Sequence, residues 1–214
     1  MSSDTVSSQS PEVSEQMQVR LDKRARIIAD GGQAYPVDLL RDHTLAQIRQ
    51  KYTDDLGELT LAPGEETTDE VTIGGRVVFV RNTGRLCFAS LQDGFTETSN
   101  GERLQVMLSK AEVGDEALAA WKSDVDLGDH VWVRGRVVVS RRGELSIMAS
   151  EWRMASKALR PLPTLHKELS EESRVRRRYA DLVVRDESRQ MVRTRAIITR
   201  AVRHALDELS LIHI

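Results

Sequence analysis

An alternation of apolar and polar residues begins near Val71 and predicts a run of short strands. The stretch GRLCFASLQDG, residues 84–94, is an example: Cys87 and Leu91 share one face of a strand, and Phe88 falls on the opposite face. The same period of two recurs in VTIGGRVVFVRN, RLQVMLSK, HVWVRGRVVVS and ELSIMASEWRM. A helical stretch, DEALAAWKSDV, separates the third predicted strand from the fourth.

Three strands, a helix and two strands follow one another in the order of an OB-fold. We therefore predict a mixed α and β fold in which residues 71–155 form a five-stranded OB-fold barrel. Gly135 lies within a predicted strand, where a small barrel bends sharply or lets another backbone approach closely. Gly143 in SRRGEL predicts a hairpin turn with positive φ.

The chain before the barrel, residues 16–70, is predicted to be a helical segment. Helical spacing in SEQMQVRLDKRARIIADGG ends at a double glycine. A second short helix is predicted after Thr44, because Thr44 and Gln47 have the spacing of a capping box. The acidic residues 53–70 contain Pro and Gly and predict a loop.

The chain after the barrel changes character twice. Two prolines predict an extended linker, and a basic segment follows it, so we assign residues 156–186 to a linker and basic segment. Residues 187–214 begin with a long helix whose apolar side chains share one face. That face needs a partner surface, and its residues are Met191, Ile198, Val202 and Leu209.

Overall charge excludes a globally basic nucleic-acid binder. The 214 residues carry a net charge of -2, with a pI near 6.2, and are 40% hydrophobic and 30% charged. Residues 171–204 nevertheless hold ten arginines against five acidic residues, a local charge of +5. Two interpretations stay open for this run: contact with nucleic-acid phosphates, or a solvated helix with ion pairs such as that of Glu187 near Arg189.

The sequence lacks the features of disulfide-bonded, secreted, membrane-spanning, P-loop and metal-binding proteins. The single cysteine, Cys87, is expected to be a small buried residue in a reducing compartment. Residues 1–15 look like a disordered leader without a secretory signal, and no apolar run is long enough for a membrane span, so we expect a cytoplasmic protein. No P-loop or dinucleotide motif is present, and the five histidines lack metal-ligand spacing.

Polar and aromatic residues on the predicted outer face of the barrel are the candidate chemistry. The strand phases place Phe88, Gln105 and Glu144 outside the core. The side of Arg81 is ambiguous, because the double glycine before it can bulge the strand and reset its phase. An outward aromatic beside amide, carboxylate and guanidinium groups is how OB-folds stack and read an unpaired base. The alternative is a solvated face with one stray aromatic.

An ordered set of stretches carries a family resemblance over roughly residues 17 to 209. It consists of LDKRARIIADGGQAYPVDLLRDHTLAQIR, GRLCFASLQDG, VDLGDHVWVRGRV, RRGELSI, KALRPLP and ESRVRRRYADLVVRDESRQMVRTRAIITRAVRHAL. The set resembles the amino-terminal part of bacterial lysyl-tRNA synthetases, the class II lysine-tRNA ligases. The ending DELSLIHI departs from the family pattern, which suggests a truncated chain.

The resemblance implies a function for the candidate face. In this family the barrel binds the tRNA anticodon. Phe88 takes the position that stacks on the central uridine, Arg81 and Gln105 take positions that contact its edge, and Glu144 takes one that reads a flanking base. The helix from Glu187 corresponds to motif 1, which forms the homodimer interface.

The resemblance also implies an activity for the full-length protein. The family attaches lysine to tRNA(Lys) with ATP and Mg²⁺, through motifs that lie further along than this sequence, so we expect the fragment alone to be inactive. The alternative is a free-standing OB-fold RNA-binding module without catalysis.

Overall fold

The computed structural model describes residues 14–94, 102–163 and 169–211, and these residues form two compact units. One unit lies within residues 1–93 and 102–161, and the other holds the described residues from Leu162 onward together with Gly94. The predicted leader, residues 1–15, lies almost entirely outside the described residues.

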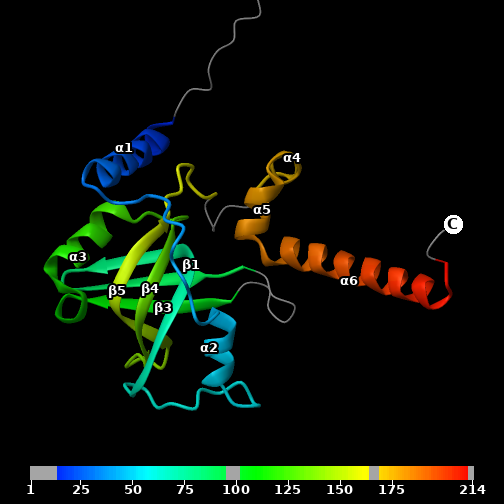
Figure 1. The fold of residues 1–214 in the computed structure, drawn as a ribbon, viewed down its shortest axis with the longest axis horizontal. Helices are drawn as coiled ribbons and strands as arrows, with labels where there is room; N and C mark the ends of the chain where they lie inside the picture. The colour runs from blue at the N-terminus through cyan, green and yellow to red at the C-terminus, as the bar shows by residue number, and fades with distance from the viewer. Residues whose placement is uncertain (1–13, 95–101, 164–168, 212–214) are drawn as a thin grey trace, which may run out of the picture. The chain divides into compact units, whose positions relative to one another are not determined.

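The first unit contains the predicted five strands, which close into a barrel in the order β1-β2-β3-β5-β4. All neighbouring strands are antiparallel except β3 and β5, which are parallel and close the barrel (Figure 1). The helix α3 packs against β3 and β5. The bounds are Glu66–Thr83 for β1, Leu86–Gln92 for β2, Arg103–Ser109 for β3, Lys110–Asp124 for α3, His130–Val139 for β4 and Leu145–Ser156 for β5.

The predicted inward residues form the barrel core. Cys87 and Leu91 are fully buried, and burial raises the pKa of the Cys87 thiol, as expected for a structural cysteine. Trp121 of α3 closes the core beside Trp152 of β5, with the two rings edge-to-face and their centroids 5.1 Å apart. Apolar burial on the inner face therefore fixes the strand phases.

The first strand begins earlier than the sequence predicts. Residues 53–70 are expected to form a loop, but β1 starts at Glu66, where Glu66 pairs with Val138 of β4. The acidic side chains of this part stay largely exposed, and Glu66 forms an ion pair with Arg136. A cross-strand cation thus allows an acidic, weakly strand-forming segment to extend the sheet.

Two glycines have the roles that the sequence predicts. At Gly135 a Cβ atom would lie 2.1 Å from the carbonyl oxygen of Met148, so β4 and β5 approach too closely there for any side chain. Gly143 adopts a φ of 83° in the hairpin between the same strands. Both positions thus depend on the absence of a Cβ atom.

The two amino-terminal helices are α1 (Glu15–Ala29) and α2 (Leu45–Lys51). The capping box at α2 is confirmed: the backbone N–H of Gln47 donates to the Thr44 hydroxyl, and the backbone N–H of Thr44 donates to the Gln47 side chain. Leu45 and Ile48 are buried and join the barrel core, which anchors α2 to the barrel.

The second unit contains α4 (Glu171–Arg176), α5 (Arg178–Val184) and the long helix α6 (Asp186–Glu208). The sequence predicts α6 but not α5. Asp181 organises the turn between α5 and α6, because its fully buried carboxylate accepts hydrogen bonds from Ser188, 2.6 Å, and from Arg178, 2.9 Å. A buried, well-bonded carboxylate is a contact that hydrophobic periodicity does not reveal.

No helix in the described part of the chain is long and apolar enough to cross a membrane.

Candidate nucleic-acid interface

A β-bulge decides which way Arg81 points. The register between β1 and β2 shifts between Val77 and Phe79: Val77 lies in the core opposite Leu91, and Val78 is an extra, buried residue without a partner in the register. The alternation then resumes with Phe79 outward. Without the extra residue, Arg81 would share the inward phase of Val77. The bulge lies at Val78 rather than at the double glycine that the sequence suggests, and it puts Arg81 on the outer face.

Arg81 and Phe88 lie directly opposite each other on β1 and β2. The guanidinium carbon of Arg81 is 4.6 Å from the centroid of the Phe88 ring, a cation–π distance. Arg81 is exposed and Phe88 is half-buried, so the ring is supported by the sheet but lies outside the core. The structure thus brings together two of the four predicted site residues.

Gln105 is held in place by a short chain of hydrogen bonds. Its side-chain Nε2 donates to the Ser146 hydroxyl at 2.9 Å, and that hydroxyl donates to the backbone carbonyl of Glu144 at 2.9 Å. These bonds cross the parallel β3–β5 pair, where Gln105 is in register with Ser146. One amide N–H is used in this way, and the side chain retains another N–H and an acceptor oxygen.

Ser146 corrects one expectation and supplies a residue that the sequence analysis misses. Its phase on β5 predicts an exposed side chain, but Ser146 is fully buried. The reason is that its hydroxyl lies between Gln105 and the Glu144 carbonyl. Strand periodicity assigns a face and contains no signal for this contact, because it depends on the pairing of strands 41 residues apart.

Glu144 is placed differently from the other three predicted residues. It lies in the β4–β5 hairpin, where its backbone exchanges hydrogen bonds with Ser140, and its side chain is exposed. Its backbone carbonyl, rather than its carboxylate, connects it to the Gln105 chain. Within the described contacts, the structure does not bring the carboxylate to Arg81, Phe88 or Gln105.

The cations of the outer face differ in how far they are neutralised. Arg136 donates to Glu112 at 2.8 Å and to Glu66 at 3.0 Å, and these hydrogen bonds raise the pKa of Arg136 despite some desolvation. The described contacts of Arg81 contain no such carboxylate. Arg81 therefore keeps its full charge available to a ligand beside the Phe88 ring.

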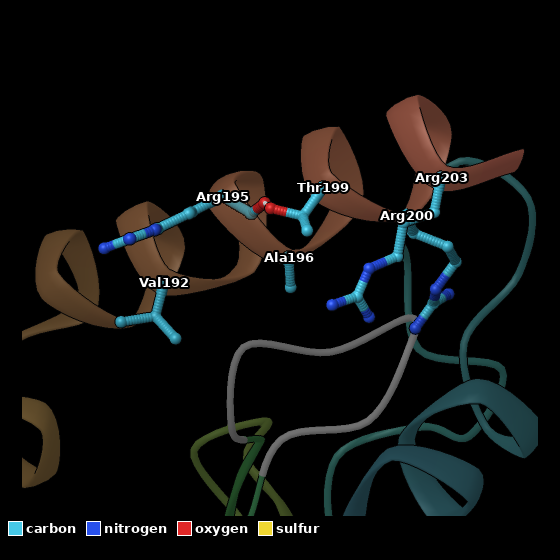
Figure 2. Close-up of a pocket in the computed structure, with 6 residues that line it drawn as sticks. All are labelled: Val192, Arg195, Ala196, Thr199, Arg200 and Arg203. Atoms are coloured by element: carbon cyan, nitrogen blue, oxygen red, sulfur yellow. Dashed lines mark hydrogen bonds between the residues drawn. The ribbon is translucent and has the colours of Figure 1, made fainter. Parts of the chain in front are cut away.

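The predicted apolar stripe is present on α6. Met191, Ile198, Val202 and Leu209 are each more than half exposed within this chain. About 100° further round the helix, a second face presents Val192, Ala196 and Thr199 among three arginines (Figure 2). The Thr199 hydroxyl on that face donates back to the Arg195 carbonyl at 2.9 Å. An apolar stripe and a basic face thus run along the same helix.

The basic segment is laced with local ion pairs. Glu172 pairs with Arg176 at 3.0 Å one helical turn away, and Asp186 pairs with Arg189. Glu187 approaches Arg185 at 3.7 Å. These contacts support the solvated-helix interpretation for part of the run and leave phosphate contact untested.

The described residues contain no group of three or more His, Cys, Asp or Glu that could hold a metal ion. His204, on α6, has a largely exposed side chain. His130, at the start of β4, is partly buried, and burial together with the charge of Arg76 lowers its pKa to about 4. No metal ligand is assigned to the described part of the chain.

Comparison with known families defines the class of the barrel. Residues 71–155 match the family model described as an OB-fold nucleic acid binding domain. The closed five-stranded barrel and its outer aromatic, amide and guanidinium groups agree with that class.

Individual relatives then give the particular resemblance. The chain is 57% identical over 92% of its length to the lysine–tRNA ligase of Kineococcus radiotolerans, and 54% identical over 92% to that of Mycolicibacterium gilvum. It spans 37% of the length of each of these relatives. It is also 36% identical to the lysylphosphatidylglycerol biosynthesis bifunctional protein LysX of Rhodococcus jostii, over 92% of this chain and 16% of that protein. The resemblance to lysyl-tRNA synthetases is therefore confirmed.

Proposed function

We propose that this chain is the anticodon-binding part of a lysine–tRNA ligase and that the outer face of its barrel binds the anticodon of tRNA(Lys). The observation that carries this proposal is the contact of Arg81 with Phe88 on the barrel face that also bears Gln105. The similarity to lysine–tRNA ligases supports the choice of tRNA as the ligand.

The geometry suits a stacked uridine. The Phe88 ring offers a face on which an unpaired base stacks, which is worth about 1 to 3 kcal/mol. A base in that position takes the place of the Arg81 guanidinium, which then donates to the edge of the base. Gln105 presents both a donor and an acceptor, as uridine does, and its Ser146 contact fixes the direction of the amide. Glu144 is retained as the residue that reads a flanking base.

The whole protein, in this proposal, attaches lysine to tRNA(Lys) with ATP and Mg²⁺ in the cytoplasm. In the proposal, ATP and Mg²⁺ belong to the full-length protein, and the described residues contain no group of three or more His, Cys, Asp or Glu that could hold a metal ion. The helix α6 is proposed as motif 1, and its stripe of Met191, Ile198, Val202 and Leu209 as part of a homodimer interface. The exposure of that stripe within one chain supports this role.

Two other assignments are less well supported. A free-standing OB-fold module would not explain why the similarity to lysine–tRNA ligases extends over 92% of the chain, well beyond the barrel. Membership of a bifunctional protein such as LysX is weakened by the lower identity, 36% against 54–57%.

Binding measurements test the proposal. Phe88→Ala is expected to weaken binding of a tRNA(Lys) anticodon stem-loop by about 1 to 3 kcal/mol, with little change in thermal stability, because Phe88 lies outside the core. Gln105→Ala is expected to relax discrimination between uridine and cytidine at the central position. Titrations at one fixed salt concentration keep the phosphate contribution constant. Unchanged binding in both variants, with the fold intact, would contradict the proposal.

A further inference from the structure

Phe79 is an aromatic residue that the proposed anticodon site does not yet use. Its side chain is 54% exposed, and among the described residues it is the only large apolar side chain on the barrel strands that is exposed to this extent. Single exposed apolar residues are common on protein surfaces and need no explanation alone. The position of Phe79 relative to Phe88 is what distinguishes it.

The bulge in β1 places Phe79 beside the stacking residue. Val78 is the extra residue and is buried, so Phe79 emerges on the outer face opposite Ser90 of β2. Phe88 lies two residues before Ser90 on the same face. Phe79 and Phe88 are therefore diagonal cross-strand neighbours, whose backbones in such pairs are about 7 to 8 Å apart, within reach of aromatic side chains.

We propose that Phe79 is a second base-stacking residue and that the barrel face holds two neighbouring unpaired nucleotides, the central uridine on Phe88 and an adjacent base on Phe79. This inference rests on the proposed function. Proteins that bind single strands stack successive bases on aromatic side chains along a basic groove. Arg81, which lies opposite Phe88 and two residues after Phe79 on β1, supplies a cation on the same face.

The two rings have different roles in recognition. Gln105, with its direction fixed by Ser146, gives the central position an edge-reading group. The ring of Phe79 has no hydrogen-bonding group and contributes stacking, which tolerates any base. Phe79 therefore adds affinity for the loop without selecting its sequence.

The first test compares Phe79 variants of the full chain in titrations with a tRNA(Lys) anticodon stem-loop. Phe79→Leu keeps apolar bulk without a ring face and is expected to weaken binding about 5- to 150-fold, whereas Phe79→Trp is expected to bind as tightly as the unchanged chain. Leu56→Ala, at an exposed apolar residue outside the barrel strands, is the matched control and should not change binding. Melting curves establish that each variant is folded.

The second test removes bases instead of side chains. Two further stem-loops each lack one base next to the central uridine, and one of them should bind the unchanged chain more weakly. On that stem-loop Phe79→Leu should cause no additional loss. The inference is overturned if the unchanged chain binds both altered loops as well as the intact one, or if folded Phe79→Leu binds the intact loop normally. In those cases, weaker binding of the stem-loop by Phe88→Ala shows that the proposed function still stands. Normal binding by both Phe88→Ala and Gln105→Ala contradicts the proposed function as well as the role of Phe79.

Discussion

The ammonium group of Lys157 lies 2.6 Å from the carboxylate of Asp129, and neither side chain has any exposed surface. The same ammonium also contacts Asp126 at 2.6 Å and the Asp124 carbonyl at 2.7 Å. These contacts tie the chain that leaves β5 to the turn between α3 and β4. The end of the barrel is thus fixed by a buried charge cluster.

Removing the lysine should therefore be costly. Lys157→Met removes the cation that pairs with Asp126 and with the fully buried Asp129. Because a buried carboxylate then lacks its partner, the free energy of unfolding is expected to fall by about 3 to 5 kcal/mol. Lys23→Met is the control, because Lys23 pairs with Asp126 in a partly exposed position, and it should cost about 1 kcal/mol or less. Urea unfolding of both variants measures the difference. Equal losses in the free energy of unfolding would mean that the buried ion pair contributes no more to stability than the partly exposed one.

Ser146 is expected to act on RNA selection through Gln105. Ser146→Ala should relax uridine-over-cytidine discrimination as much as Gln105→Ala does, and the double variant should add little, because both changes break one hydrogen-bond chain. Ser150→Ala, another β5 serine whose hydroxyl bonds a carbonyl, should leave discrimination intact. Paired titrations with two stem-loops measure the effect. Full discrimination in Ser146→Ala would show that Gln105 needs no support.

His130 should make the barrel sensitive to acid. Its pKa is about 4 in the folded protein, against about 6.5 in the unfolded chain, because of burial and the charge of Arg76. Between these pH values the unfolded state binds more protons, so stability falls as the pH falls from 6.5 to 4, by about 3 kcal/mol in all. His130→Gln should flatten this part of the profile. Carboxyls with a lowered pKa, such as Asp126 and Glu112, begin to contribute below about pH 5, so the two slopes are compared between about pH 6.5 and 5. An unchanged slope in the variant would exclude His130 as its source.

The crossing at Gly135 should tolerate no side chain. Gly135→Ala places a Cβ atom 2.1 Å from the Met148 carbonyl and is expected to destabilise the barrel by at least about 2 kcal/mol. Gly74→Ala is the matched control, because its Cβ atom would lie 3.8 Å from its nearest neighbour, the Val131 carbonyl, an ordinary contact. Its effect should stay below about 1 kcal/mol. Thermal melts measure the stability of the two variants. Equal melting temperatures would contradict the close approach of the two strands at Gly135.

The stripe on α6 should drive self-association. Val202→Glu, on the stripe, is expected to shift the chain toward monomer in sedimentation velocity. Ile197→Glu changes an equally exposed residue on another side of the helix, 56% against 54% exposed, and should leave association unchanged. Equal effects of both changes would point to general charge repulsion rather than to the stripe.

Local patterns in the sequence were sufficient to predict the barrel and the short helix before it. Alternation identified Cys87 and Leu91 as core residues, and the Thr44–Gln47 spacing identified the cap of α2, because both features depend on near neighbours in the chain. Lys157 shows the limit of this reasoning. It opens a stretch that predicts an extended linker, yet it is fully buried by partners about thirty residues earlier.

The candidate site shows the same division. The phases of Phe88 and Gln105 followed from their own strands, and the structure places both on the outer face. The orientation of Arg81 depended on a bulge, and the burial of Ser146 depended on strand pairing, so neither could be settled from alternation. The exposure of Phe79 could not be predicted for the same reason, because simple alternation from Val77 would place its side chain on the inner face.

The parallel pairing of β3 with β5 also sets the order in which the candidate site is completed during synthesis of the chain. Gln105 acquires its fixed direction only when Ser146 is in place, and Ser146 belongs to the last strand of the barrel. A ribosome that has released the chain only as far as β4 has already exposed Arg81 and Phe88, but not the group that orients the amide. In the proposed site, selection of uridine therefore awaits the final strand, which both orients Gln105 and closes the barrel.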